Sequence, residues 1–130
     1  MVEENRKTRI FVVDDEVSFT KLVKLTLEAR GNYEVCALNN PKLAVATALK
    51  FMPDIIILDV VMPEIDGGEL YHLLKLNPPL KDIPIIFLTA IVRQKELEKN
   101  RGMIGGSFYL AKPVSADALL RAVEQQLHHS

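Results

Sequence analysis

Acidic, hydroxyl and amino side chains stand at the ends of short apolar runs along this 130-residue sequence. Asp14 and Asp15 follow one such run, Asp59 ends a second, Thr89 a third, and Lys112 follows a fourth. Two carboxylates about 4 Å apart repel by roughly 4 kcal/mol at an effective dielectric constant of about 20, so a cluster of three binds a cation or raises a pKa. Carboxylate oxygens with main-chain carbonyls and water suit a hard ion such as Mg²⁺, and no His or Cys stands among these positions to favour zinc. The residue types therefore predict a magnesium site.

The same residues could also carry phosphoryl transfer. A carboxylate can act as a nucleophile toward a phosphoryl group and form an acyl phosphate. The metal and the ammonium of Lys112 would neutralise charge on the transferred oxygens, which is where such transfers are catalysed. The Thr89 hydroxyl could hold a further phosphoryl oxygen, and the small Ala90 beside it would leave room for the group to enter.

Short β-rich runs alternate with helical spacing along the chain. The runs at residues 9–13, 33–38, 55–58, 85–88 and 108–111 predict five strands. Apolar residues at three- and four-residue intervals predict helices; they include Leu22 in the first, Leu49 in the second and Leu73 in the third. Asn40 and Ser115 are expected helix caps. Residues 93–100 are mostly charged and Gly102, Gly105 and Gly106 follow, so we expect a short fourth helix and a loose loop there.

This alternation predicts an α/β fold. Its expected form is a doubly wound sandwich with a five-stranded parallel sheet. Ligands of such folds bind beyond the carboxyl ends of the strands, where the strand order reverses. The candidate residues all stand at those ends, so we expect them to converge on one edge of the sheet.

In combination, these motifs are similar to the receiver domain of bacterial two-component response regulators. The motifs are Asp14-Asp15, Asp59-Val60-Val61-Met62-Pro63, Gly67, Thr89-Ala90 and Lys112-Pro113. One acidic pair would be weak evidence, but this set stands in the family's order and at family-like intervals. The resemblance covers residues 9–127 and implies a flavodoxin-like (βα)5 fold with strand order 2-1-3-4-5.

The resemblance implies a role for each residue of the phosphoryl site. Asp59 matches the phosphoacceptor, Lys112 the lysine that contacts the phosphoryl group, and Thr89 the hydroxyl that swings toward it. Tyr109 matches the aromatic switch residue that turns inward together with the threonine.

The resemblance also implies the metal site. Asp14, Asp15, Asp59 and the main-chain carbonyl of Val61 match its Mg²⁺ ligands, Asp14 acting through water, and Mn²⁺ is an expected substitute. The bond before Pro113 is expected to be cis.

By resemblance, the function is that of a phosphorelay signalling switch. A histidine kinase or histidine phosphotransfer protein would phosphorylate Asp59, and the face built by helix 4, strand 5 and helix 5 would change conformation to control a downstream effector or output domain. A phosphorylation-dependent dimer is a further possibility.

Val61 and Ile91 occupy two positions that tune the chemistry in receivers. Both are apolar and cannot orient a hydrolytic water, so we expect a long-lived acyl phosphate.

The sequence is less consistent with three other functions. A Mg²⁺-dependent phosphohydrolase would place a second acid two residues after its nucleophile, where this chain has Val61, so no turnover of an external substrate is expected. A nucleotide-binding protein would show a G-x-x-x-x-G-K-[ST] or G-x-G-x-x-G motif, and neither is present. A docking domain that works without phosphorylation is disfavoured because no member of the pocket is missing.

Composition bounds the partners and the compartment. The formal charge is −1, from 16 basic and 17 acidic residues, so nothing points to direct nucleic-acid binding or to a membrane surface. One cysteine excludes an intrachain disulfide, and the polar start of the chain lacks an apolar stretch of signal-peptide length, so a cytoplasmic protein is expected. We expect one receiver domain over residues 1–130 without an output domain, either a stand-alone receiver or a piece of a longer regulator.

Overall fold

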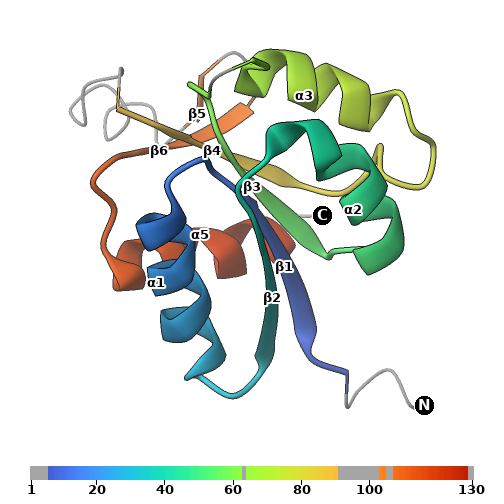
Figure 1. The fold of residues 1–130 in the computed structure, drawn as a ribbon. Coiled ribbons are helices and arrows are strands. Elements are labelled where there is room, and N and C mark those ends of the chain that lie inside the picture. Colours follow the sequence, from blue (N-terminus) through green and yellow to red (C-terminus); the bar gives the residue numbers. More distant parts are fainter. Residues whose placement is uncertain (1–5, 63, 91–102, 105–106, 129–130) are drawn as a thin grey trace.

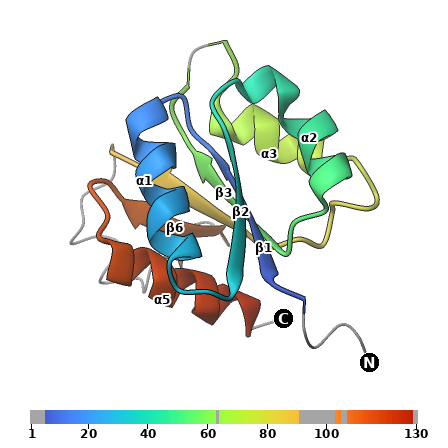
Figure 2. The same ribbon diagram turned by 60° about the horizontal axis from the view of Figure 1, so that its bottom comes forward.

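A computed structural model describes residues 6–62, 64–90, 103–104 and 107–128 of the protein. In chain order the elements are β1 (Thr8–Val13), α1 (Val17–Glu28), β2 (Tyr33–Leu38), the 3₁₀ helix η2 (Pro41–Leu43), α2 (Ala44–Phe51), β3 (Ile55–Asp59), α3 (Gly67–Lys75), β4 (Ile85–Thr89), β5 (Met103–Ile104), β6 (Ser107–Ala111) and α5 (Ala116–Leu127). Figure 1 shows a twisted sheet between helices. In Figure 2, α1 and α5 lie on one face of this sheet and α2 and α3 on the other. The fourth helix expected at residues 93–100, and the glycines after it, lie outside the described residues.

The sheet has the order β2-β1-β3-β4-β6-β5. Its first five strands are parallel, so the predicted order 2-1-3-4-5 is confirmed, with β6 as the fifth expected strand. The two-residue strand β5, which pairs antiparallel with β6, was not predicted. The chain leaves β1 toward β2 on one side and later returns to β3 on the other, so the strand order reverses between β1 and β3. Ligands of doubly wound sheets bind at such a point, beyond the carboxyl ends of these two strands.

Both faces of the central strands are buried, and successive side chains supply two separate cores. Ile10 and Val12 of β1 face the core beneath α1 and α5, which also contains Leu27 and Val123. Phe11 and Val13 face the core beneath α2 and α3. This alternation explains why the strand sequences are continuously apolar, as expected for a parallel sheet with helices on both sides.

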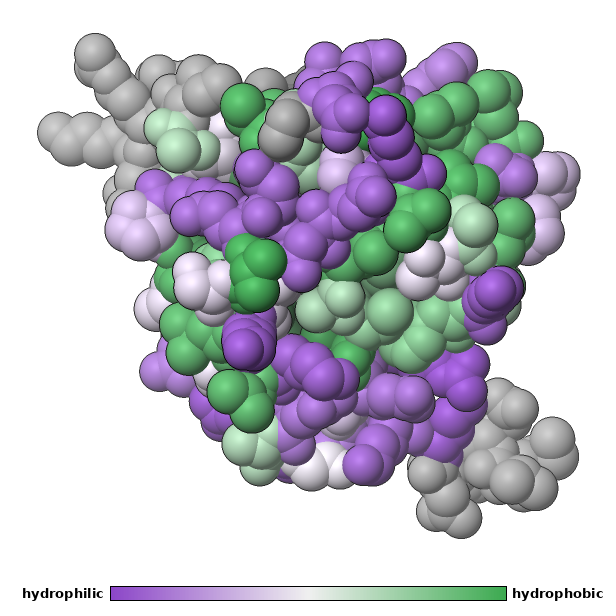
Figure 3. Space-filling view, in the orientation of Figure 1, coloured by the Kyte–Doolittle hydropathy of each residue, from purple (hydrophilic) through white to green (hydrophobic). Residues whose placement is uncertain are grey.

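The apolar spacing located the helices but misassigned some of their buried positions. Leu22 is 63% exposed, Leu49 39% and Leu73 41%, although each was expected to mark an apolar face. In Figure 3 hydrophobic residues gather on the surface over α2 and α3, where Leu43, Met52 and Leu76 are also exposed. Periodicity therefore predicts a wider apolar stripe than the sheet covers.

Two of the helix starts follow the expected capping chemistry. Ser115 caps α5 by accepting a hydrogen bond from the Ala118 N–H at 3.1 Å, as predicted. Asn40 was also a predicted cap, and its side chain accepts from the Lys42 N–H at 3.1 Å in front of η2. Glu16 occupies the N-cap position of α1 but makes no side-chain capping bond there.

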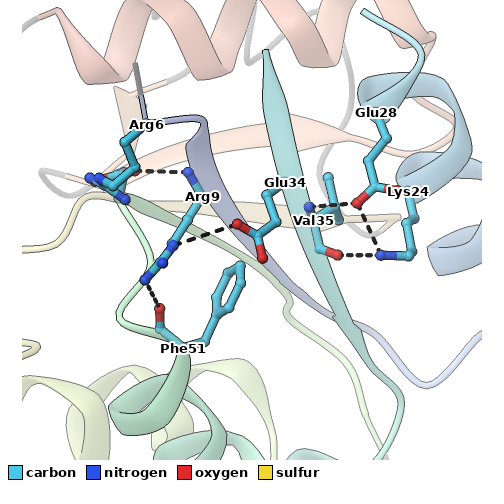
Figure 4. Close-up of polar contacts among 8 residues, drawn as sticks. Arg6, Arg9, Lys24, Glu28, Glu34, Val35 and Phe51 are labelled. Carbon is cyan, nitrogen blue, oxygen red and sulfur yellow. Dashed lines mark hydrogen bonds and ion pairs between the residues drawn. The ribbon is translucent and has the colours of Figure 1, made fainter. Parts of the chain in front are cut away.

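Polar contacts at the amino ends of the strands tie β1 to its neighbours (Figure 4). Arg9 Nε lies 3.6 Å from Glu34 Oε1 on β2, and Arg9 Nη1 donates to the Phe51 carbonyl at the end of α2 at 2.9 Å. Strands rise by about 3.3 Å per residue, so Arg9 is separated from the residues after β1 by roughly 16 Å. The basic residues at this end are therefore too distant to neutralise acids at the carboxyl end.

Candidate functional site

Four parallel strands deliver the predicted residues to one edge of the sheet. Asp14 and Asp15 follow β1, Asp59 ends β3, Thr89 ends β4, and Lys112 follows β6. The strand register aligns these ends: Asp59 pairs with Leu88, and Thr89 pairs with Ala111. The Lys112 N–H donates to the Thr89 carbonyl at 2.8 Å, which extends the ladder by one residue beyond β6.

The three aspartates form one cluster. Asp14, Asp15 and Asp59 each offer a carboxylate oxygen, and these three oxygens lie within 4.8 Å of one another. Asp14 is fully buried, Asp59 is 6% exposed, and Asp15 is exposed to solvent. The cluster thus has two buried members and one open to the solution, an arrangement in which an ion can enter from one side.

Lys112 supplies positive charge beside this cluster. Its Nζ lies 2.7 Å from Asp14 Oδ2, 3.0 Å from Glu16 Oε1 and 3.6 Å from Asp59 Oδ2. The ammonium also lies over the Phe19 ring, 4.8 Å from its centroid. Burial lowers the pKa of Lys112, but its contacts with Asp14 and Glu16 outweigh burial and raise the pKa above the ordinary lysine value. Lys112 is therefore charged at neutral pH.

One ammonium does not compensate three carboxylates. Burial, and then the charge of Asp14, raise the pKa of Asp59 to about 6, although Lys112 and a hydrogen bond from the Val61 main chain act in the opposite direction. Burial likewise raises the pKa of Asp14, against the opposing effect of Lys112. Lys112 alone therefore does not neutralise the cluster, and a bound cation would favour the ionised carboxylates.

The donor set fits a hard divalent ion. All three clustered ligands are carboxylates, the type of oxygen donor that Mg²⁺ prefers. Asp14 Oδ2 is buried and accepts no aligned hydrogen bond from the described residues, despite its close ion pair with Lys112. A buried carboxylate oxygen without an aligned donor is available to a water of a hydrated ion. The Val61 main-chain carbonyl, expected as a fourth protein ligand, stays a prediction.

A glycine allows the segment after β3 to close against α3. The Gly67 N–H donates to the Val60 carbonyl at 2.8 Å. A Cβ atom on Gly67 would lie 2.6 Å from the main-chain oxygen of Asp59 and 2.9 Å from Val60 Cα. No side chain fits there without a backbone shift, so the start of α3 is placed directly against the acidic residue that ends β3.

Thr89 and Tyr109 stand on the neighbouring strands β4 and β6, with Tyr109 two positions before the residue that pairs with Thr89. Thr89 is 2% exposed, and Ala90 after it is exposed. Tyr109 is half-buried and stacks on Phe87 with ring centroids 5.0 Å apart; Phe87 in turn contacts Tyr71 of α3 at 5.5 Å. Aromatic rings thus connect β6 to α3 across β4. The Lys112–Pro113 peptide bond is cis.

Sequence reasoning missed three residues that hold the site in place. Glu16 and Phe19 contact Lys112, as described above. Asn39 follows β2, and its amide donates to the Asp14 carbonyl and to Thr20 Oγ1, both at 2.8 Å. Glu16 and Asn39 lie just after β1 and β2 and could have been suspected on that ground, whereas Phe19 lies within α1 and its phenyl ring is not a metal ligand. Ile91 lies outside the described residues, and the Val61 side chain is 56% exposed.

The fold and this site define a doubly wound α/β protein with an acidic, lysine-containing site at the carboxyl edge of its sheet. The family described as the response regulator receiver domain matches residues 10–124. The chain belongs to this family.

Relatives and solved structures agree with this assignment. The chain is 35% identical over 123 residues to the phosphate regulon transcriptional regulatory protein PhoB of Rhizobium meliloti, covering 94% of the chain and 53% of that protein. The chain thus spans about half the length of this relative. A response regulator from Desulfuromonas acetoxidans aligns with a TM-score of 0.78 and 31% identity, covering 93% of this chain and 97% of that one. The chemotaxis protein CheY4 of Vibrio cholerae aligns with a TM-score of 0.78 and 29% identity, covering 92% and 98%. Among the described residues, no helix is both long and apolar enough to span a membrane.

Proposed function

We propose that this receiver domain is a phosphorelay switch that accepts a phosphoryl group on Asp59 in a Mg²⁺-dependent reaction. The donor is a histidine kinase or a histidine phosphotransfer protein. One observation carries the proposal: Asp59 lies in a cluster with Asp14 and Asp15 and has the Lys112 ammonium 3.6 Å from its carboxylate. This arrangement combines a nucleophile, a cation site and a fixed positive charge at one strand end.

The transfer step conserves atoms and electron pairs. A carboxylate oxygen of Asp59 attacks phosphorus, and the bond from phosphorus to the histidine nitrogen breaks. The imidazole nitrogen keeps that electron pair, and the aspartate becomes an acyl phosphate. The nucleophile must be ionised; a pKa of about 6 leaves most of Asp59 charged at neutral pH, and a bound cation would lower this pKa further.

Asp14, Asp15, Asp59 and the Val61 carbonyl are the proposed holders of the metal, with Mn²⁺ as a substitute. When bound, Mg²⁺ supplies charge neutralisation for the oxygens of the transferred group. Lys112 contributes a second positive charge to those oxygens. Its buried ion pair with Asp14 keeps the ammonium at the site before the phosphoryl group arrives.

The proposed switch couples Thr89 to Tyr109. The Thr89 hydroxyl binds the phosphoryl group, and Tyr109 turns inward with it. The stacking of Tyr109 on Phe87 supports this role, because a half-buried ring on the neighbouring strand can report a change at the end of β4. A shift from mostly inactive to mostly active requires a few kcal/mol of differential stabilisation. The output face is the predicted fourth helix together with β6 and α5.

The partner of this face is a downstream effector or an output domain, and a phosphorylation-dependent dimer is part of the same proposal. PhoB, about twice as long as the matched chain, is a transcriptional regulator. We assign any contact with nucleic acid to such a further domain and not to this chain, whose formal charge is −1. The proposed compartment is the cytoplasm, where the phosphodonors act.

In this function the chain catalyses its own phosphorylation and does not turn over an external substrate. The position two residues after Asp59 is Val61, so it has no acid to serve a leaving group. With Ile91 also apolar, neither position can orient a hydrolytic water. The acyl phosphate should therefore be long-lived, and a half-life of seconds in purified, Mg²⁺-containing buffer would contradict this part.

The test is an intact-mass measurement after incubation with Mg²⁺ and acetyl phosphate, with Asp59→Asn alongside. The carboxylate attacks the phosphorus of acetyl phosphate and acetate leaves with the electron pair. We expect a gain of one phosphoryl group in the parent only, and no gain with EDTA present. An equal gain in Asp59→Asn would contradict the assignment of the acceptor.

A further inference from the structure

Glu16 occupies a helix-capping position without capping the helix. It is the N-cap residue of α1, yet its side chain accepts no hydrogen bond from the first turn. Ser, Thr, Asp and Asn are favoured at this position because their short side chains accept such a bond. Asp66 and Ser115 do so for α3 and α5. The side chain of Glu16 is therefore free to make a contact outside α1.

That contact is Lys112. Glu16 Oε1 lies 3.0 Å from Lys112 Nζ and accepts a hydrogen bond from it. Asp14 Oδ2 lies 2.7 Å from the same nitrogen, whereas Asp59 Oδ2 lies 3.6 Å away, beyond hydrogen-bond distance. The Phe19 ring closes a third side of the ammonium. The two shortest contacts of the lysine are thus with carboxylates on the β1–α1 side, and its contact with Asp59 is the longest of the three.

Glu16 differs from Asp14 in its relation to the proposed cation. Asp14 belongs to the acidic cluster, together with Asp15 and Asp59, and Glu16 does not. A cation bound in that cluster would attract the carboxylate of Asp14 and weaken its contact with Lys112. Glu16 would then be the carboxylate that still binds the lysine. The Glu16 side chain is 60% exposed, so its ion pair with Lys112 is a solvent-accessible one, unlike that of the buried Asp14.

We propose that Glu16 is a positioning residue that holds Lys112 away from Asp59 and competes with the phosphoryl group for the lysine ammonium. The inference rests on the proposed function, because the competitor is a phosphoryl group on Asp59. Lys112 has three N–H donors, and each one that Glu16 engages must be released or shared before the ammonium faces a phosphoryl oxygen. Loss of Glu16 therefore favours the state with the phosphoryl group bound.

The experiment uses beryllium fluoride with Mg²⁺ as the phosphoryl probe, and compares the parent with Glu16→Gln and Glu16→Ser. Glu34→Gln is the matched control, because it removes one exposed acid that pairs with Arg9 at the opposite end of the sheet. Both Glu16 variants should bind the probe about two- to fivefold more tightly than the parent, the equilibrium equivalent of an exposed ion pair. Glu34→Gln should bind it like the parent.

Two metal-free measurements separate positioning from a structural role. Limiting acetic anhydride should modify Lys112 several-fold faster in Glu16→Gln than in the parent, relative to the exposed Lys50 of α2 in the same molecule. Glu16→Ser should unfold at no lower temperature than the parent, because serine supplies the missing cap of α1.

Unchanged probe affinity and unchanged Lys112 labelling in Glu16→Gln would overturn the inference and leave the proposed function standing. The same tightening in Glu34→Gln would also overturn it, since net charge alone would then be the cause. A parent that fails to bind beryllium fluoride in Mg²⁺ would contradict the proposed function and this inference with it.

Discussion

Gly67 lies so close to Asp59 that a Cβ atom on the glycine would be 2.6 Å from the main-chain oxygen of the aspartate. Gly67→Ala must therefore push α3 away from the end of β3. Forcing a group into a packed site of this kind costs about 1–3 kcal/mol, which urea unfolding would detect. Because the clash is with the main-chain oxygen of Asp59 itself, we also expect slower phosphorylation by acetyl phosphate.

The adjacent Gly68 is the matched control for this substitution. A Cβ atom there would meet only a side-chain oxygen of Asp66, at 3.3 Å. Gly68 is exposed in the first turn of α3, so Gly68→Ala should change the free energy of unfolding by no more than about 1 kcal/mol. Equal losses in the two variants would contradict the close approach as the cause.

The stability of the metal-free protein should depend on the ionisation of Asp59. Its pKa is raised from an ordinary value of 3.8 to about 6. A group with a raised folded-state pKa stabilises the protein below its unfolded pKa, and this contribution is lost as the pH rises through about 6. Asp59→Asn removes the ionisation. In Mg²⁺-free buffer above pH 7, we expect the free energy of unfolding of Asp59→Asn to be higher than that of the parent by up to about 3 kcal/mol.

Urea unfolding of both proteins at several values between pH 4 and pH 8 measures this difference. The gap should be smallest near pH 4, since the folded parent carboxyl is then almost fully protonated and the unfolded one about half protonated. A gap that is independent of pH would show that a packing change, and not the charge of Asp59, separates the two proteins.

Mg²⁺ should stabilise the parent, and EDTA should reverse the effect. At a free concentration ten times the Kd, one site that binds only the folded state contributes about 1.4 kcal/mol. Asp15→Asn removes the solvent-exposed acid of the cluster and should weaken the effect. Asp117→Asn, which alters an acid 75% exposed on α5, should leave it unchanged. Thermal unfolding against Mg²⁺ concentration gives all three results, and a similar response in Asp15→Asn and the parent would contradict the predicted site.

Thr89 should be needed to transmit phosphorylation but not to accept it. Thr89→Ala retains Asp59, the acids and Lys112, so acetyl phosphate should still modify it. Tyr109 should then fail to respond, because the hydroxyl that draws the switch inward is missing. Fluorine NMR of 3-fluorotyrosine-labelled protein with beryllium fluoride reads this response, and Thr89→Ser should restore it. If the Tyr109 signal of Thr89→Ala responded to beryllium fluoride as it does in the parent, this route of coupling would be ruled out.

The strand order was predicted from the resemblance to receiver domains, because the alternation of apolar strands and helical segments by itself indicates only a doubly wound parallel sheet. The sequence did not predict β5, since two residues carry too little pattern to mark a strand. It also overestimated the burial of Leu22 and Leu73, because three- and four-residue spacing describes a helix face without saying how much of it the sheet covers.

The ionisable site residues were predictable because they stand at the carboxyl ends of parallel strands, which meet at one edge of the sheet. The residues that orient them were not, because orientation depends on contacts between distant segments. Glu16 looks like one more surface acid in the sequence, and only its 3.0 Å distance to Lys112, 96 residues away, distinguishes it. Asn39 is similarly ordinary until its amide is found on the Asp14 carbonyl.

The most direct test of the central claim is to locate the modified residue. Protein treated with Mg²⁺ and acetyl phosphate is reduced with borohydride, which converts an aspartyl phosphate to homoserine, and is then digested and sequenced by tandem mass spectrometry. We predict homoserine at position 59 alone, and none when EDTA replaces Mg²⁺. Homoserine at Asp14 or Asp15, with an unmodified Asp59, would contradict the assignment of Asp59 as the phosphoacceptor.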